Sequence, residues 1–318
     1  MTRAFIFPGQ GSQAVGMGKA LAEAFAPARE VFQEVDEALS QNLSRLMWDG
    51  PESDLLLTEN AQPAIMAASM AVIRVLQREG GLDFARHARL VAGHSLGEYS
   101  ALCAAGAFTL ADAARLLKIR GRAMQEAVPV GVGAMSALLG AEIALAEEAA
   151  KEAVAQASEA DPVCVVANDN APGQVVISGR KATVDRAGEI AKAKGAKRAM
   201  PLSVSAPFHC PLMKPAADKM ADALAAVTIR PPAVPVVANV TAAETNEPET
   251  IRRLLVEQVT GRVRWRESVL AFRACGVETT VEAGGNKVLT GMVKRIDKEL
   301  LTVTLDSAAD IEAFARTL

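Results

Sequence analysis

The sequence lacks the features that mark membrane, nucleic-acid-binding and disulfide-rich proteins. Its four cysteines are far apart and no pair has C-x-x-C spacing, so neither a zinc site nor a redox motif is predicted. With 34 basic against 37 acidic residues, the net charge of −3 excludes a surface that binds nucleic acid mainly through phosphates. No uncharged stretch is longer than residues 127–141, which is shorter than the ~18 residues that suggest a membrane span. The first apolar run, Ala4–Phe7, is too short for a secretion signal, so we expect a cytoplasmic protein without membrane attachment.

The amino-acid composition is typical of a soluble globular protein. Half of the 318 residues are apolar and 22% are charged, which indicates a sizeable core rather than a disordered chain. Aromatic residues are few (nine Phe, two Trp and one Tyr), so alanine supplies much of the apolar surface and favours closely packed helices. The length suits one large domain or two smaller ones.

The pattern of short apolar runs predicts an α/β fold with an inserted subdomain. Ala4–Phe7 and Leu90–Ala92 read as buried parallel strands, each followed by a glycine-containing turn and a helix, the first from about Met17 to Leu39. Residues 130–202 instead follow the order β-α-β-β-α-β, the ferredoxin-like pattern. We therefore expect a large subdomain with a parallel sheet, residues 1–129 and 203–318, and a small ferredoxin-like subdomain, residues 130–202.

A serine is predicted at a tight turn between a strand and a helix. Gly93-His94-Ser95-Leu96-Gly97 fits G-x-S-x-G, and such a turn lifts the serine hydroxyl clear of the sheet. The main-chain N–H of Leu96, at the helix N-terminus, can face a developing oxyanion. The plain alternative is a turn serine without chemistry, and the strand and helix around the motif favour the nucleophile.

Elimination among three histidines gives the candidate base. His87 lies in a charged linker, and His94 adjoins the serine, where neighbouring side chains usually diverge. His209 remains as the general base that a serine nucleophile needs, although a lone loop histidine is more often an ordinary polar residue. No acidic residue stands out as its orienting partner, so a full triad is not predicted.

Arg120 stands on the apolar face of a predicted helix that begins after Thr109 and ends near Ala127. At 100° per residue it falls within the arc of leucine, alanine and methionine, while the other cationic residues of the helix lie opposite. A buried guanidinium needs an anion. Geometry alone leaves two candidates, an internal carboxylate and a substrate carboxylate held by the planar fork.

The turn at residues 7–13 follows the first strand and is rich in glycine. It lacks both the Lys-Ser/Thr ending of a phosphate loop and the G-x-G-x-x-G spacing of a dinucleotide site. A main-chain N–H from this loop is instead a candidate second oxyanion donor, as in hydrolase-like folds.

Seven stretches together carry a family resemblance: FPGQGSQ at Phe7–Gln13, QPA at Gln62–Ala64, GHSLGEYSAL at Gly93–Leu102, IRGRAMQEAVP at Ile119–Pro129, NAPGQVVISG at Asn170–Gly179, SAPFHCPLMKPA at Ser205–Ala216 and KVLTGMVKRI at Lys287–Ile296. They resemble the malonyl-CoA:acyl-carrier-protein transacylases of bacterial fatty acid synthesis, over essentially the whole chain. The resemblance implies a hydrolase-like large subdomain and a ferredoxin-like small one.

The resemblance also implies roles for individual residues. Ser95 would be the acylated nucleophile, His209 its base, and Arg120 the ligand of the malonyl carboxylate. The N–H groups of Gln10 and Leu96 would form the oxyanion hole. A main-chain carbonyl rather than an acid would orient the histidine. Well-known members carry a glutamine shortly before a tryptophan, where this chain has Arg264-Trp265, so Arg264 becomes the candidate for orienting His209.

The implied reaction is a two-step transfer of malonyl from malonyl-CoA to the thiol of acyl carrier protein, with no metal or redox cofactor. We expect a monomer. Two basic clusters are candidates for docking the acidic carrier protein: Lys192, Lys194, Lys197 and Arg198, and Lys287, Lys294, Arg295 and Lys298. The alternatives are a serine thioesterase or esterase, an acyltransferase of polyketide synthesis, and a non-catalytic acyl-binding protein.

Overall fold

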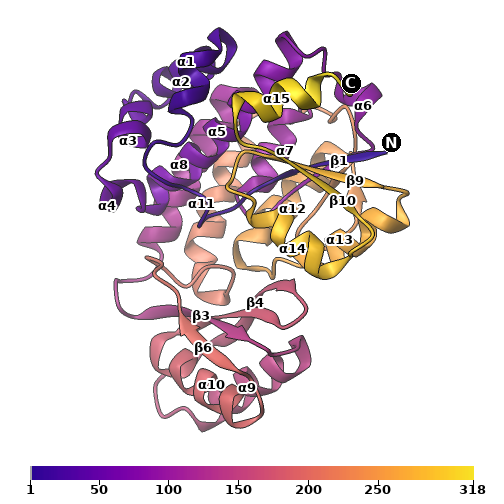
Figure 1. The fold of residues 1–318 in the computed structure, drawn as a ribbon. Coiled ribbons are helices and arrows are strands. Elements are labelled where there is room, and N and C mark those ends of the chain that lie inside the picture. Colours follow the sequence, from indigo (N-terminus) through magenta and orange to yellow (C-terminus); the bar gives the residue numbers. More distant parts are fainter. Residues whose placement is uncertain (1) are drawn as a thin grey trace.

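Two separate β-sheets organise the chain, which a computed structural model describes over residues 2–318 (Figure 1). Within these residues, the larger sheet has six strands in the order β10-β9-β1-β2-β7-β8 and the smaller has four in the order β4-β5-β3-β6. The strands are β1 Arg3–Phe7, β2 Leu90–Gly93, β3 Gly133–Leu139, β4 Cys164–Ala171, β5 Gln174–Arg180, β6 Arg198–Pro201, β7 Val236–Val237, β8 Glu244–Thr245, β9 Thr279–Ala283 and β10 Leu301–Leu305.

Helices connect and cover these strands. They are α1 Lys19–Ala24, α2 Ala26–Leu39, α3 Leu43–Asp49, α4 Glu52–Leu55, α5 Thr58–Arg78, α6 Phe84–His87, α7 Gly97–Ala104, α8 Leu110–Glu126, α9 Ile143–Gln156, α10 Lys181–Ala193, the 3₁₀ turn η1 Pro211–Met213, α11 Lys214–Ala225, α12 Pro248–Thr260, α13 Trp265–Ala274, α14 Val288–Ile296 and α15 Ala308–Ala315. None of the helices described has both the length and the apolar character that crossing a bilayer requires.

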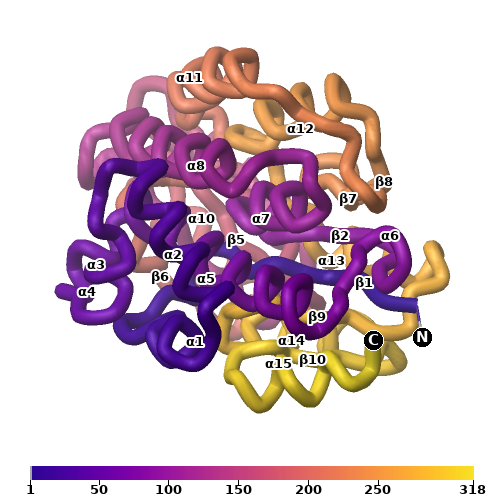
Figure 2. Tube along the Cα trace, turned by 90° about the horizontal axis from the view of Figure 1, so that it is seen from above, coloured from indigo at the N-terminus to yellow at the C-terminus, as the bar shows by residue number. Residues whose placement is uncertain are grey.

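The large sheet is buried on both faces, because side chains of a strand alternate between them. On β1, Phe5 and Phe7 pack into a core with α2, α5, α7 and α8, whereas Ala4 and Ile6 pack with α13 and α14 on the other face. Strands β10, β9, β1, β2 and β7 run parallel, and β8 pairs antiparallel with β7. Helices α2, α5 and α8 lie side by side (Figure 2).

The small sheet is antiparallel throughout and lies apart from the large one (Figure 1). Its strand order and its two helices, α9 and α10, follow the ferredoxin-like pattern. Alanines on one face of α9 let this helix approach the sheet closely: Ala146, Ala149, Ala150 and Ala153 are all buried there. The predicted fold class, a parallel sheet with an inserted ferredoxin-like unit, is confirmed.

One helix prediction is wrong in a way that the local chemistry explains. The helix expected from about Met17 to Leu39 is two helices, α1 and α2, separated by Phe25 in an extended conformation. Pro27 lies in the first turn of α2, where its missing N–H costs nothing, but inside a continuous helix it would remove a hydrogen bond. The first half of the stretch also contains Gly18 with a positive φ of 76°, at the N-cap of α1.

Candidate active site

The predicted turn serine stands where β2 ends and α7 begins. Ser95 has a φ of +52°, the left-handed region that a residue with a side chain adopts at a cost. The two flanking glycines make the turn possible, because a Cβ on Gly93 would lie 1.9 Å from the carbonyl of Gly97 and a Cβ on Gly97 would lie 2.2 Å from the carbonyl oxygen of Phe7. The Ser95 side chain is thereby lifted above the carboxyl edge of the sheet.

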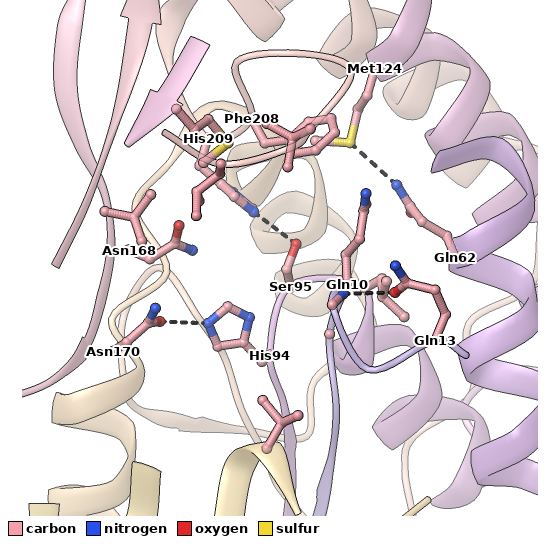
Figure 3. Close-up of a pocket in the computed structure, with 18 of the residues that line it drawn as sticks. Gln10, Gln13, Gln62, His94, Ser95, Met124, Asn168, Asn170, Phe208 and His209 are labelled. Carbon is pink, nitrogen blue, oxygen red and sulfur yellow. Dashed lines mark hydrogen bonds between the residues drawn. The ribbon is translucent and has the colours of Figure 1, made fainter. Parts of the chain in front are cut away.

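The base predicted by elimination lies within hydrogen-bond distance of this serine. His209 Nε2 is 2.8 Å from Ser95 Oγ, although 114 residues separate the two in the chain (Figure 3). His209 Nδ1 faces two main-chain carbonyl oxygens, of Gln258 at 2.9 Å and of Gly261 at 3.1 Å. Carbonyl oxygens accept hydrogen bonds and do not donate, so Nδ1 carries the proton and Nε2 offers its lone pair to the hydroxyl of Ser95.

The imidazole is held in its neutral form. His209 is 3% exposed. Its burial, together with the nearby positive charge of Arg120, lowers the pKa of His209 from 6.5 to about 3. At neutral pH the ring is therefore free to accept a proton from Ser95, which is what a general base must do.

Arg120 reaches the same serine from α8. It is 1% exposed, and its Nη2 donates to Ser95 Oγ at 3.1 Å. The two amide oxygens that it also contacts are neutral: Gln62 Oε1 accepts at 2.8 Å and Gln258 Oε1 at 2.8 Å. Its Nε has no hydrogen-bond partner, and in the described part of the chain no carboxylate forms an ion pair with it. Of the two anions left open by the sequence, no internal carboxylate is paired with Arg120 among these residues, although that of Glu98 lies close enough to interact with it electrostatically.

The two candidate oxyanion donors are main-chain N–H groups of residues that line the cavity beside Ser95. Gln10 lies in the turn after β1, and Leu96 immediately precedes α7. Both line the cavity beside Ser95, and within residues 2–318 neither N–H has a hydrogen-bond acceptor. Because β1 and β2 are paired in parallel with Phe7 opposite Gly93, the turns that follow them emerge at the same edge of the sheet. This arrangement can stabilise an oxyanion between the two N–H groups.

A cavity of about 300 Å³ opens in front of these groups, between the edge of the large sheet and the small sheet. Asn168 and Asn170 of β4 face it from the side opposite Gln62, with Ser95 between them (Figure 3). His94, expected to point away from Ser95, lines the same cavity, and its Nε2 is 2.8 Å from Asn170 Oδ1. Both sheets therefore contribute to the site.

Arg264 does not orient His209, which corrects the expectation from the sequence. Its guanidinium forms an ion pair with Glu267 and donates to the carbonyl oxygens of Val240 and Thr241, and its own carbonyl accepts from Ser268. The carbonyls that hold His209 belong to Gln258, seven residues before Trp265, and to Gly261. A glutamine, Gln258, is thus part of the site, although Arg264 stands directly before the tryptophan.

Sequence reasoning missed four polar residues around Ser95: Glu98, Asn239 and Gln258, and Gln62 as a partner of Arg120. For Gln258 a signal existed. It lies on α12 within the buried stripe of Ile251, Leu254, Leu255 and Val259, as Arg120 lies on the buried face of α8. In the part of the chain that is described, no three His, Cys, Asp or Glu side chains are grouped to hold a metal ion.

The chain is similar to known acyl transferases over nearly its full length. The model of the acyl transferase domain family matches residues 4–312. The malonyl CoA-acyl carrier protein transacylase of Salmonella typhimurium is 48% identical over 310 residues, which cover 98% of this chain and 97% of that protein. A crystal structure of an acyl-carrier-protein-S-malonyltransferase from Bartonella henselae is similar with a TM-score of 0.96 and 53% identity, covering 100% of this chain and 99% of that one.

A further solved structure contains two proteins. It is described as a type II PKS acyl-carrier protein in complex with its malonyl-transacylase. This chain matches it with a TM-score of 0.94 and 44% identity, covering 100% of both chains.

Proposed function

The chain belongs to the acyl transferase domain family, and from that premise we propose that it transfers a malonyl group from malonyl-CoA to the pantetheine thiol of acyl carrier protein. The observation that carries the proposal is the buried Arg120, which donates to the hydroxyl of Ser95 while its other hydrogen-bond partners are neutral amides. A guanidinium in that position suits an acyl group that ends in a carboxylate. Named relatives that act on malonyl-CoA and acyl carrier protein support it.

The first half of the reaction forms a seryl ester. Ser95 Oγ attacks the thioester carbon of malonyl-CoA while its proton passes to Nε2 of His209. The tetrahedral oxyanion is stabilised by the N–H groups of Gln10 and Leu96. As the carbon–sulfur bond breaks, coenzyme A leaves as a thiol with the proton from His209. The malonyl carboxylate stays with Arg120.

The second half returns the enzyme to its starting state. The pantetheine thiol of acyl carrier protein gives its proton to His209 and attacks the seryl ester through the same oxyanion. Ser95 leaves and regains the proton from Nε2. Every step moves one proton between named groups and breaks an already activated acyl bond, so we expect no metal or redox cofactor.

The carrier protein would approach over α14. Of the two basic clusters predicted from the sequence, the one on and around α14 adjoins the cavity, because Leu289 and Met292 of this helix line it. In the other cluster, Lys194 already forms ion pairs with Glu148 and Glu152. We expect Lys294→Glu to raise the KM for carrier protein and to weaken its salt dependence, and Lys192→Glu to change both less. The reverse order would assign docking to the other cluster.

A single trapping experiment tests the function against its alternatives. The protein is incubated with malonyl-CoA, the mass of the peptide containing Ser95 is measured, and discharge of the adduct to carrier protein is compared with discharge to water. We expect an adduct that is stable in water and lost rapidly to carrier protein. Rapid loss to water would identify a thioesterase, and no adduct would leave an acyl-binding protein.

The same assay with different carriers addresses the pathway. Fatty acid and polyketide carrier proteins present the same pantetheine thiol, and one matching structure holds a polyketide carrier. We propose that the protein acts in fatty acid synthesis, that it is cytoplasmic and that it is a monomer. Faster discharge to a polyketide carrier than to a fatty acid carrier would reverse the pathway assignment, and light scattering measures the oligomeric state.

A further inference from the structure

The strained backbone of Ser95 is held on both sides by amide side chains from distant segments. Its N–H donates to Asn239 Oδ1 at 2.7 Å, and its carbonyl oxygen accepts from Gln258 Nε2 at 3.0 Å. Asn239 Nδ2 also donates to the carbonyl of Gly93 at 2.7 Å. The turn is therefore braced by residues 144 and 163 positions later in the chain, and not by its own glycines alone.

Glu98 connects the two braces. It follows Ser95 by three residues, on the first turn of α7, and is 2% exposed. A single oxygen, Oε2, accepts from the main-chain N–H of Asn239 at 3.0 Å and from Gln258 Nε2 at 2.8 Å. In the described part of the chain Glu98 forms no ion pair with a lysine or arginine. A buried carboxylate held by amides is costly, which calls for a role that an apolar residue could not fill.

The orientation of the Gln258 amide shows what that role is. The NH₂ group of Gln258 faces two acceptors, Glu98 and the carbonyl of Ser95, while its oxygen faces a donor, Arg120. A flipped amide would point NH₂ at the guanidinium and its oxygen at a carboxylate, placing like groups together at both ends. An acceptor at position 98 therefore sets the direction of the amide, and through it the placement of Arg120.

We propose that Glu98 is a positioning residue for acyl transfer, whose acceptor oxygen orients Gln258 and Asn239 so that they hold the backbone of Ser95 and the guanidinium of Arg120. The acyl specificity in this proposal rests on the malonyl transfer proposed above. The bracing of Ser95 rests on contacts that are independent of the acyl group.

The contacts of Glu98 require a hydrogen-bond acceptor at this position rather than a negative charge. Burial raises the pKa of Glu98 to about 7, against smaller lowerings by its hydrogen bonds from Gln258 and Asn239 and by the positive charge of Arg120. Protonated and ionised forms thus coexist near neutral pH, and both keep an oxygen that accepts. Glutamine resembles the protonated form, so Glu98→Gln preserves the acceptor, whereas Glu98→Met preserves the approximate volume and removes it.

The test compares these two variants with a control that loses a carboxylate far from the site. Asp36→Asn is suitable, because Asp36 accepts two hydrogen bonds from Ser44 between α2 and α3. For each protein, kcat and KM are measured with malonyl-CoA and acetyl-CoA, the labelling rate of Ser95 by a fluorophosphonate is recorded, and the melting temperature is determined.

We expect Glu98→Met to lower kcat by about 10- to 100-fold with a smaller change in KM, to slow fluorophosphonate labelling and to reduce the preference for malonyl over acetyl. Glu98→Gln and Asp36→Asn should stay within about threefold of the unaltered protein. Full activity of Glu98→Met overturns the proposal. So does a loss in Glu98→Gln greater than about tenfold at an unchanged melting temperature, which decides the matter even if Glu98→Met does not fold.

Failure of the proposed function has a different signature. In that case the unaltered protein is not acylated by malonyl-CoA, yet its Ser95 still reacts with the fluorophosphonate. The labelling rates of Glu98→Met and Glu98→Gln then still report whether Glu98 positions the serine.

Discussion

Replacing Arg120 with alanine removes the group that we assign to the acyl carboxylate. The guanidinium is buried, lies 3.1 Å from Ser95 Oγ and can offer a carboxylate two charge-assisted hydrogen bonds. Such bonds contribute about 1.5–3 kcal/mol each, and a loss of about 3–5 kcal/mol corresponds to roughly 10²- to 10⁴-fold in kcat/KM for malonyl-CoA. Acetyl-CoA has no carboxylate, so its kcat/KM should change far less and the selectivity should collapse.

The assay is the transfer rate to carrier protein from each thioester, measured side by side. Arg120→Lys keeps the charge without the planar fork and should fall between the unaltered protein and alanine. Arg122→Ala is the matched control, since Arg122 lies on the exposed face of the same helix and pairs with Glu126. Equal losses with malonyl-CoA and acetyl-CoA in Arg120→Ala would refute the assignment, because they would show a structural or general catalytic role.

The same substitution has a second consequence that a carboxylate assay does not measure. The positive charge of Arg120 is the largest contribution after burial to the lowered pKa of His209. Removing it raises that pKa, so the acid limb of the pH profile of kcat/KM moves to higher pH. The profile measured with acetyl-CoA isolates this effect from the loss of carboxylate binding. An unmoved acid limb would contradict the electrostatic coupling of the two residues.

Three further predictions concern the architecture around the site. Gly97→Ala should abolish transfer, because the added Cβ would lie 2.2 Å from the carbonyl oxygen of Phe7. The control Gly291→Ala should keep its activity, because the added Cβ would have no atom within 4 Å. Comparable activity of the two variants would count against a sterically required turn. Gly133→Ala should lower kcat by about tenfold, because its Cβ would lie 2.3 Å from the ring of Pro207, two residues before His209. Unchanged transfer would show that the loop can move aside without displacing His209. In the unfolded chain His209 is protonated below pH 6.5, but in the folded protein only below about pH 3. The free energy of unfolding therefore decreases as the pH is lowered through this interval. Between pH 7 and 5 the melting temperature of His209→Gln should therefore decrease less than that of the unaltered protein. An identical decrease would refute the lowered pKa of His209.

The core of the site was predictable because each of its residues breaks a local pattern. A serine between two glycines at a strand–helix junction, and a charged residue on an apolar helix face, conflict with what the element needs for stability. Ser95 and Arg120 stand out for these reasons, and the requirement for a base then selects His209. The three were expected together from the sequence, and they lie together in the structure.

The supporting residues were not predictable in the same way. Asn239 lies in a loop after the two-residue strand β7, and nothing local in the sequence marks it. Its importance comes from a contact with Ser95 across 144 residues, which depends on the tertiary fold. The error at Arg264 has a related cause, since spacing to a tryptophan does not reveal which carbonyl faces the imidazole. The turn of α12 decides that, by placing Gln258 beside His209.

A binding arginine has to satisfy two opposing conditions before its ligand arrives. Buried without partners it would be too costly, but paired with an internal carboxylate it would have to break an ion pair to bind substrate. Two neutral amides, of Gln62 and Gln258, resolve the conflict by satisfying donors of Arg120 without cancelling its charge. The nearby carboxylate of Glu98 forms its hydrogen bond with the Gln258 amide and not with the guanidinium, although the two charges interact electrostatically. In the proposed function, selectivity for a carboxylate-bearing acyl group would therefore depend on the uncharged Gln258, which lies between the buried carboxyl group of Glu98 and the buried guanidinium of Arg120.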